Sequence, residues 1–254
     1  MKLKKLEDII LKYGILSWVL LLAAWQIGSM FYSDEFLPGI LTTLRGAADL
    51  IKSGDLQEDF LISFWRILRS WSLAMCFAIP AGLCIGFFKL PGRLFEPLVN
   101  FFRFIPAISL VTLVMMWFGV GESAKTVLIF YAAIFPIMIN AIAGARSAPQ
   151  HLIEAAQLLG ASRFHIFFYI VVPAAVPYIF TGIRLGLSSS MICIVSAEML
   201  AASSGIGHLI YTARLYYRTD WILIGIFVLG FSGFLADKLL QFAGRKFLYR
   251  YGVR

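Results

Sequence analysis

The sequence IEAAQLLGASRFHIFFYIVVP, residues 153–173, interrupts a chain that is otherwise mostly apolar. It carries a carboxylate, an arginine, a histidine and a glycine, too many polar groups for a helix in lipid. The whole chain has 254 residues, 60% of them hydrophobic and 14% charged. A soluble domain is nearer about half apolar and about a quarter charged, and this composition would expose too much apolar surface to water. We therefore expect an all-α integral membrane protein in which residues 153–173 lie outside the lipid.

Six segments are long and apolar enough for helices that cross a bilayer, which takes about 20 residues each. The first follows a basic N-terminus, as in a signal peptide, but it is long enough to span and no small-residue cleavage site follows it. We expect a retained helix and one transmembrane domain over residues 1–254. The expected spans are 14–32, 70–88, 101–119, 124–145, 174–201 and 221–243, with segment 146–173 between the fourth and the fifth.

The positions of lysine and arginine predict the orientation of these spans, because such residues accumulate in cytoplasmic loops. Both ends of the chain are basic, and so are the loop after the second span and segment 146–173; Arg66, Arg69, Arg214 and Arg218 are exceptions. We expect both termini and segment 146–173 to be cytoplasmic. The net charge is +8, and the basic residues cluster beside apolar spans. Membrane orientation explains this distribution better than binding to nucleic acid does. The three cysteines lie in apolar segments without CxxC spacing, so we expect neither disulfides nor a metal site.

Segment 146–173 has the pattern of two short helices joined by a bend. Ser147 and Gln150 have the spacing of a capping box, and Leu152, Ala155, Ala156 and Leu159 would form one apolar stripe. Gly160 is expected to end the first helix in a left-handed conformation. Ser162 would then cap a second short helix.

The polar face of the first short helix indicates its purpose. A helix that lies on a lipid surface should carry Lys and Arg there, whereas this one carries Glu154 and Gln157. Docking into a groove of a soluble partner is therefore favoured over an interfacial helix pair, which remains the alternative.

The same segment resembles a known motif. Glu154, Ala155 and Ala156, followed at fixed spacing by Gly160, Ile170 and Pro173, are similar to the EAA motif of permease subunits in binding-protein-dependent ATP-binding-cassette (ABC) importers. Val172 stands where that family usually has leucine. SAEMLAASSGIGHLI, residues 196–210, resembles the nitrate, sulfonate and taurine branch. FLPGI, residues 36–40, only partly resembles the LPSP segment of that branch, because Gly39 and Ile40 replace Ser and Pro.

The resemblance implies a type I importer permease (MetI-like) fold and a transport subunit without enzymatic activity. Helices within 147–170 would be coupling helices seated on a cytoplasmic ATPase subunit, which would bind the ATP; the permease itself would need no cofactor. An extracytoplasmic binding protein would deliver a small anion or organic sulfonate, and two copies of the chain would pair in the inner (plasma) membrane of a bacterium. The ATPase-coupling residues would be Glu154, Ala155, Ala156, Gly160, Arg163, Ile170 and Pro173.

The sequence GVGESAKT, residues 119–126, is one residue away from a phosphate-binding loop. Ala124 replaces the second glycine, no strand precedes the segment, and the expected topology places it outside the cell. We expect no nucleotide site here, and we expect Lys125 to anchor the span at the membrane interface.

The expected fifth span carries polar residues on one helical stripe: Arg184, Ser188, Met191 and Glu198. Arg184 and Glu198 are too far apart to pair within one helix. Ionisable residues inside spans are functional candidates, so our hypothesis is that the stripe lines the translocation path. The alternative is that its charges lock helix packing or reach the membrane surface.

Two other classes of protein compete with the importer interpretation. An ion-coupled secondary transporter should show inverted repeats and broken helices, and the sequence shows neither clearly. An intramembrane enzyme would need a buried dyad or a metal set such as HExxH, which the sequence lacks.

Overall fold

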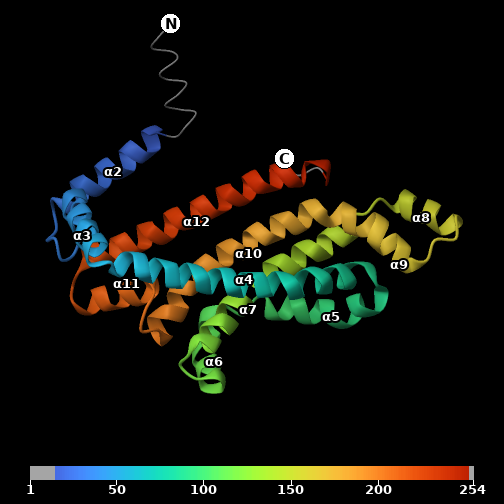
Figure 1. Cartoon of the computed structure of the whole chain (residues 1–254), viewed down its shortest axis with the longest axis horizontal. Helices are drawn as coiled ribbons and strands as arrows, with labels where there is room; N and C mark the ends of the chain where they lie inside the picture. The colour runs from blue at the N-terminus through green and yellow to red at the C-terminus, as the bar shows by residue number, and fades with distance from the viewer. Residues whose placement is uncertain (1–14, 252–254) are drawn as a thin grey trace, which may run out of the picture. The chain divides into compact units, whose positions relative to one another are not determined.

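The computed structural model describes residues 15–251, and these residues contain helices and turns but no strand (Figure 1). They divide into two compact units, one comprising residues 15–58 with 209–228 and the other residues 59–208 with 229–251. Three long elements contribute to both units: α4 (Asp55–Phe87), α11 (Ile206–Leu215) and α12 (Thr219–Phe247).

The first unit contains α2 (Ile15–Ser29) and α3 (Ile40–Ser53). Gly39 offers no side chain to cap α3, and Gln26 of α2 takes that role: the Ile40 amide donates to Gln26 Oε1 over 3.1 Å. The expected span 14–32 corresponds to α2, whose 15 residues extend about 22 Å. Among the described residues, α2 counts as a shorter apolar helix and not as a candidate span. Residue 14 and the basic N-terminal residues lie outside the described part of the chain.

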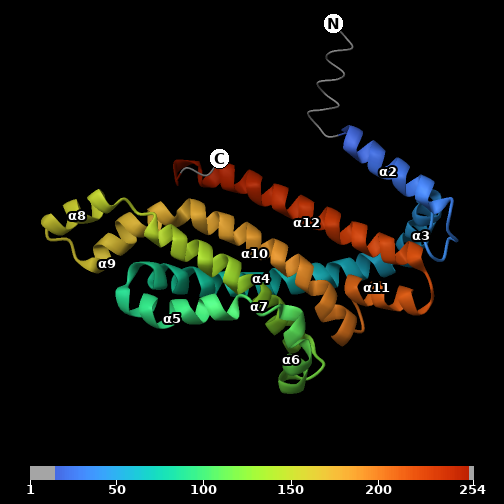
Figure 2. The same cartoon turned by 180° about the vertical axis from the view of Figure 1, so that it is seen from behind.

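The second unit holds the long helices and the segment that resembles the EAA motif. Figure 2 shows α7 and α10 side by side, as Figure 1 does from the other side. Besides α4, α11 and α12, its elements are α5 (Lys89–Phe102), the 3-10 turn η1 (Ala107–Leu110), α6 (Val111–Phe118), α7 (Glu122–Arg146), α8 (Gln150–Leu158), α9 (Arg163–Ile166), the π turn η2 (Phe167–Val171), α10 (Val172–Ala201) and the 3-10 turn η3 (Tyr249–Tyr251).

Within the described residues, four helical stretches are long and apolar enough to cross a membrane, or five if one bent pair counts as a span. The expected number was six. The four stretches are 55–87, 122–146, 163–200 and 219–247. The bent pair and the short α2 account for the difference.

The expected continuous span over 101–119 is wrong. The chain there forms the end of α5, a break, and then η1 with α6, and the two halves are bent by 87°. Pro106 is extended and caps η1, with φ −64° and ψ 133°. Proline has no amide hydrogen and disfavours helical geometry in the residue before it, which favours the break at this point.

The fifth span begins earlier than the sequence indicates. The expected boundary at Pro173 is not a break, since α9, η2 and α10 form one continuous stretch from Arg163 to Leu200. Pro173 lies in the first turn of α10, where its missing amide hydrogen does no harm. The π turn just before it has a wider hydrogen bond, from the Val172 amide to the Phe167 carbonyl.

Glycines at four-residue spacing allow α7 to pack closely against its neighbours. A Cβ atom on Gly82 of α4 would lie 2.6 Å from the Met138 carbonyl oxygen of α7. A Cβ atom on Gly186 of α10 would lie 2.6 Å from Ile137 Cγ1, also on α7. Both α4 and α10 therefore approach α7 closely at these glycines, as small residues permit in membrane proteins.

Candidate functional site

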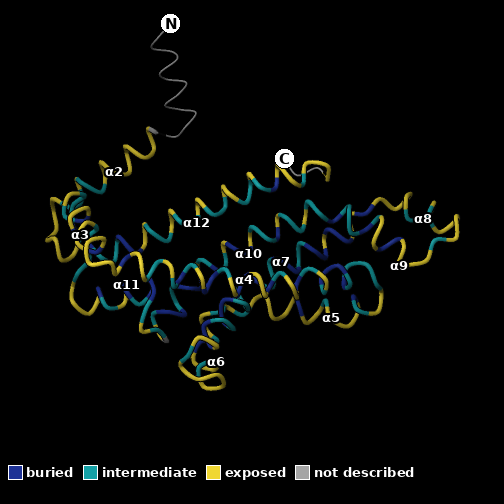
Figure 3. The backbone as a smooth tube through the Cα atoms, viewed as in Figure 1, coloured by how far each residue is buried: buried dark blue, intermediate teal, exposed yellow. Residues whose placement is uncertain are grey.

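Helices α8 and α9 lie at one end of α7 and α10 (Figure 1), and α8 is largely exposed (Figure 3). Leu158 and Leu159 are 89% and 88% exposed. The carboxylate of Glu154 is exposed and accepts a hydrogen bond from Gln150 Nε2 at 3.1 Å. The element thus presents apolar side chains and one carboxylate away from the helices that carry it.

The expected capping box is wrong. Ser147 Oγ donates to the Gly144 carbonyl over 2.8 Å, so this serine ends α7 instead of starting α8. Pro149 occupies the N-cap position of α8 and provides no side-chain hydrogen bond.

The bend between α8 and α9 has the predicted conformation. Gly160 has φ +79°, in the left-handed region, and a Cβ atom there would meet nothing within 4 Å. The Ala161 amide closes the turn by donating to the Ala156 carbonyl over 2.9 Å. Ser162 caps α9, because its Oγ accepts from the His165 amide at 3.3 Å. The glycine bend and the serine cap are both confirmed.

The predicted coupling residues fall into two groups. Ala156 and Ile170 pack against a small core that includes Ile166 and Val171, while Pro173 is half-buried. The remainder are exposed: Glu154, Ala155, Gly160 and Arg163. The expected stripe is therefore divided, since Ala156 faces inward while Leu152 and Leu159 face outward.

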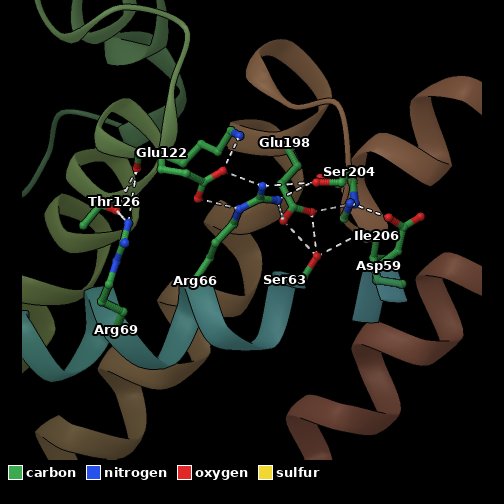
Figure 4. Close-up of polar contacts among 12 residues, drawn as sticks. Asp59, Ser63, Arg66, Arg69, Glu122, Thr126, Glu198, Ser204 and Ile206 are labelled. Atoms are coloured by element: carbon green, nitrogen blue, oxygen red, sulfur yellow. Dashed lines mark hydrogen bonds and ion pairs between the residues drawn. The ribbon is translucent and has the colours of Figure 1, made fainter. Parts of the chain in front are cut away.

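Glu198, a member of the predicted translocation stripe, lies at the centre of a buried polar cluster (Figure 4). Its side chain is 0% exposed. Ser63 Oγ lies 2.8 Å from both carboxylate oxygens, and Arg66 Nη1 donates to Oε1 over 2.7 Å. Glu198 thus contacts side chains of α4. These surroundings match the alternative interpretation of the stripe, in which its charges lock helix packing.

The guanidinium of Arg66 connects three elements. Besides Glu198 of α10, it donates from Nη2 to Glu122 Oε1 of α7 at 2.6 Å and from Nη1 to the Ser204 carbonyl at 2.8 Å (Figure 4). Lys125 Nζ also reaches Glu122, at 2.8 Å. Arg66 and Lys125 are buried, and the carboxylates of Glu198 and Glu122 that pair with them offset the cost of burying these cations. The prediction that Lys125 anchors at the membrane interface is wrong, because this lysine is 4% exposed.

The start of α11 is held by the same cluster. The amide of Gly205 donates to Asp59 Oδ1 at 2.6 Å, that of Ile206 to Ser63 Oγ at 2.8 Å, and that of Gly207 to Glu198 Oε2 at 2.8 Å. The first amides of a helix lack partners within the helix and carry partial positive charge. The carboxylates and the serine satisfy them, which fixes where α11 begins.

Sequence reasoning missed the partners of Glu198. Asp59, Ser63 and Arg66 are spaced four and three residues apart, which places them on one face of α4. This polar face at the start of an otherwise apolar helix was the available signal. The sequence did not show which helix this polar face of α4 contacts.

The other end of the predicted stripe is also paired. Arg184 Nε donates to Asp237 Oδ1 over 2.7 Å, and Nη2 to Oδ2 over 3.0 Å, a bidentate contact between α10 and α12. Ser188 Oγ donates to the Arg184 carbonyl at 3.3 Å. Met191 lies near Gly233 of α12, where an added Cβ atom would be 3.7 Å from its Cγ. The four stripe residues therefore do not share one surface, and their place on a translocation path stays a prediction.

Among residues 15–251, no group of three His, Cys, Asp or Glu side chains could hold a metal ion. Several apolar helices, one bent pair and a projecting helical hairpin are the features of a multi-pass membrane protein.

Comparison with known proteins identifies the family. Residues 75–247 match the family described as binding-protein-dependent transport system inner membrane component, and the chain belongs to it. It is similar to a probable ABC transporter permease protein of Brucella melitensis biotype 1, with 36% identity over 92% of each chain. It is also similar to the taurine transport system permease protein TauC of Escherichia coli (strain K12), with 32% identity over 94% of this chain and 89% of that one.

A solved structure of the MetNI methionine ABC transporter in inward-facing conformations has the same fold. The TM-score is 0.54 at 22% identity, over 70% of this chain and 92% of that chain. The type I importer permease fold is thus confirmed, and so is the resemblance to the nitrate, sulfonate and taurine branch. The chain is the membrane-embedded permease subunit of an ABC importer, and the secondary-transporter alternative is set aside.

Proposed function

We propose that this permease moves a small anion or organic sulfonate across the inner membrane of a bacterium and is driven through α8 and α9 by a cytoplasmic ATPase subunit. Two copies of the chain form the path, and ATP binds only to the partner ATPases. An extracytoplasmic binding protein delivers the substrate. Both termini and the α8–α9 segment face the cytoplasm, as the basic loops indicate.

The observation that carries the coupling proposal is the projecting α8, with exposed leucines and an exposed carboxylate, which ends at a sharp glycine bend. Exposed apolar area on a rigid helix suits a groove in a soluble partner. Glu154 would add a charge-assisted contact to a basic group of the ATPase. The substrate class is supported by the likeness to the taurine permease.

The proposal is tested by reconstituting the chain in liposomes with its ATPase and binding protein. We expect ATP hydrolysis and uptake that both depend on the binding protein loaded with a sulfonate. Uptake by the permease alone, driven by a proton or sodium gradient, would refute it.

Coupling through Glu154 is tested by moving its charge along α8. The double variant E154Q/Q157E keeps the net charge of the helix but displaces the carboxylate by three residues, and both positions are exposed. We expect membrane insertion to be unchanged and uptake per ATP hydrolysed to fall about tenfold or more, as for the loss of a charged contact of about 1.5–3 kcal/mol. Normal coupling in the double variant would contradict a role for this carboxylate.

Coupling through the bend is tested at Gly160. G160V places a β-branched residue at φ +79° and should weaken ATPase docking. Gly54 has φ +87° with equally open surroundings, so G54V is a control with similar backbone strain in another part of the chain. Equal uptake for the two variants would argue against the bend as a coupling element.

A further inference from the structure

A cavity of about 470 Å³ lies in the second unit, at the break between α5 and η1. This volume is within the range of small-molecule sites, about 300–1,000 Å³. Its walls come from the segment around Pro106, from α7 and from α10. Much of the lining is apolar, with Ile105, Ile108, Phe135 and Ile192, and its polar side chains are Arg103, Tyr131, Ser189 and Ser196.

The cavity lies beside the middle of α7 and beside the C-terminal half of α10. Tyr131 is nine residues, or about 13 Å, after the start of α7, and Pro136 is ten residues, or about 15 Å, before its end. In secondary transporters, substrate sites lie at broken helices near the middle of the bilayer. The break beside Pro106 meets the middle of α7 at this cavity.

Arg103 differs from Arg66 and Arg184, two arginines that also contact these helices. Arg66 and Arg184 are neutralised by carboxylates. For Arg103, the described residues provide no carboxylate, only the ring of Phe104, whose centroid lies 4.7 Å from the guanidinium carbon. The side chain of Arg103 is exposed beside the cavity, and cations without a counter-ion among membrane helices mark substrate pathways.

The backbone before Arg103 is held in place. Tyr131 OH donates to the Phe102 carbonyl over 2.7 Å, which ties the end of α5 to the middle of α7. The cation is therefore presented from a fixed point at the rim of the cavity. Tyr131 is a positioning residue in this arrangement.

We propose that this cavity, the Arg103 cavity, is a transient binding site for a small organic anion on the translocation path. The guanidinium of Arg103 binds the anionic head, and the hydroxyls of Ser189 and Ser196 donate to its remaining oxygens. The short apolar part of the anion packs against Phe135 and Ile192. This inference rests on the proposed function and names the place where the path holds its substrate.

The test uses cysteine labelling in the complete complex in membranes. The native cysteines are replaced (C76S/C84S/C193S), and Ser196, half-buried in the cavity wall, becomes the probe as S196C. Two methanethiosulfonate reagents of similar size are compared, one with an ethylsulfonate group and one with an ethyltrimethylammonium group. We expect the anionic reagent to react about tenfold faster, because a cleft lined by one sign of charge concentrates the opposite ion about 10–10³-fold.

Arg103 is then changed. R103Q should abolish the preference for the anionic reagent, and R103K should restore part of it. The control is R93Q, which removes the same charge from an exposed position on the same helix α5. Y131F should reduce the preference without abolishing it. Equal rates for the two reagents, no labelling by either, or an equal effect of R93Q would each overturn the proposal.

The ligand class is tested by protection against labelling. We expect ethanesulfonate to slow the labelling of S196C more than nitrate does at equal concentration. Protection by nitrate alone would overturn the assignment to an organic anion. Labelling needs no transport, so loss of substrate-stimulated ATP hydrolysis in the unmodified complex would count against the proposed function and not against the cavity.

Discussion

Replacing Glu198 with glutamine removes one charge from the buried cluster and changes little else in shape. Arg66 then keeps one of its two carboxylate partners, Glu122, which Lys125 shares. Arg66 is only 6% exposed, so water cannot compensate for the lost carboxylate. Breaking a buried ion pair by removing one partner costs about 3–5 kcal/mol.

This cost converts into a shift of the melting temperature. For a domain of this size, each 1 kcal/mol lowers Tm by about 2–4 °C, so E198Q should lower it by about 6–20 °C. The measurement is thermal unfolding of the purified permease in detergent, followed by tryptophan fluorescence. The matched control is E96Q, which breaks the ion pair between Glu96 and Arg146, whose side chains are 31% and 50% exposed. An exposed pair contributes about 0–1 kcal/mol, so the control should lose less than about 4 °C.

A double variant separates the pair from the rest of the cluster. R66M/E198M removes both charges and leaves Glu122 with Lys125 as a balanced pair. Apolar replacement of a whole buried pair is often neutral, so this variant should be more stable than E198Q. If E198Q were as stable as the unchanged protein, or no less stable than E96Q, the cluster would not hold α4, α7 and α10 together.

Two further predictions concern glycines and use the same Tm measurement. G186A places a methyl group 2.6 Å from Ile137 Cγ1 and should cost about 1–3 kcal/mol, whereas G230A, with nothing within 4 Å inside α12, should stabilise by up to about 1 kcal/mol; equal losses would exclude close packing as the reason for Gly186. G205A combines φ +109° with a contact to the Glu198 carboxylate, so it should destabilise by about 1–3 kcal/mol and add little to the effect of E198Q; full additivity would show that the two residues act independently.

The segment from Glu154 to Pro173 shows how far sequence reasoning reaches when the interactions are local. The left-handed bend at Gly160 and the Ser162 cap follow from the backbone preferences of one or two residues, and both were predicted. The capping box at Ser147 failed because the serine lies between the free carbonyls at the end of α7 and the free amides at the start of α8, and it donates to a carbonyl of α7. A spacing rule cannot decide between neighbouring helix ends.

The break at Pro106 was harder to predict. Prolines at positions 80 and 136 lie inside continuous helices, whereas Pro106 separates two. All three residues lie in apolar surroundings and look alike in the sequence. Whether a helix bends or ends at proline depends on what satisfies the freed carbonyl groups, and neighbouring helices supply those partners.

The sequence alone determined that this protein is a helical membrane permease, because apolar length, charge bias and the EAA spacing are properties of the chain read in order. Only the tertiary structure decided what the charged residues do. It buried Glu198 against Arg66 from a helix 132 residues away, paired Arg184 with Asp237 from another helix, and left Arg103 facing a cavity. In a low-dielectric interior the partner of a charge determines its energy, and partners far apart in the sequence meet only when the helices pack.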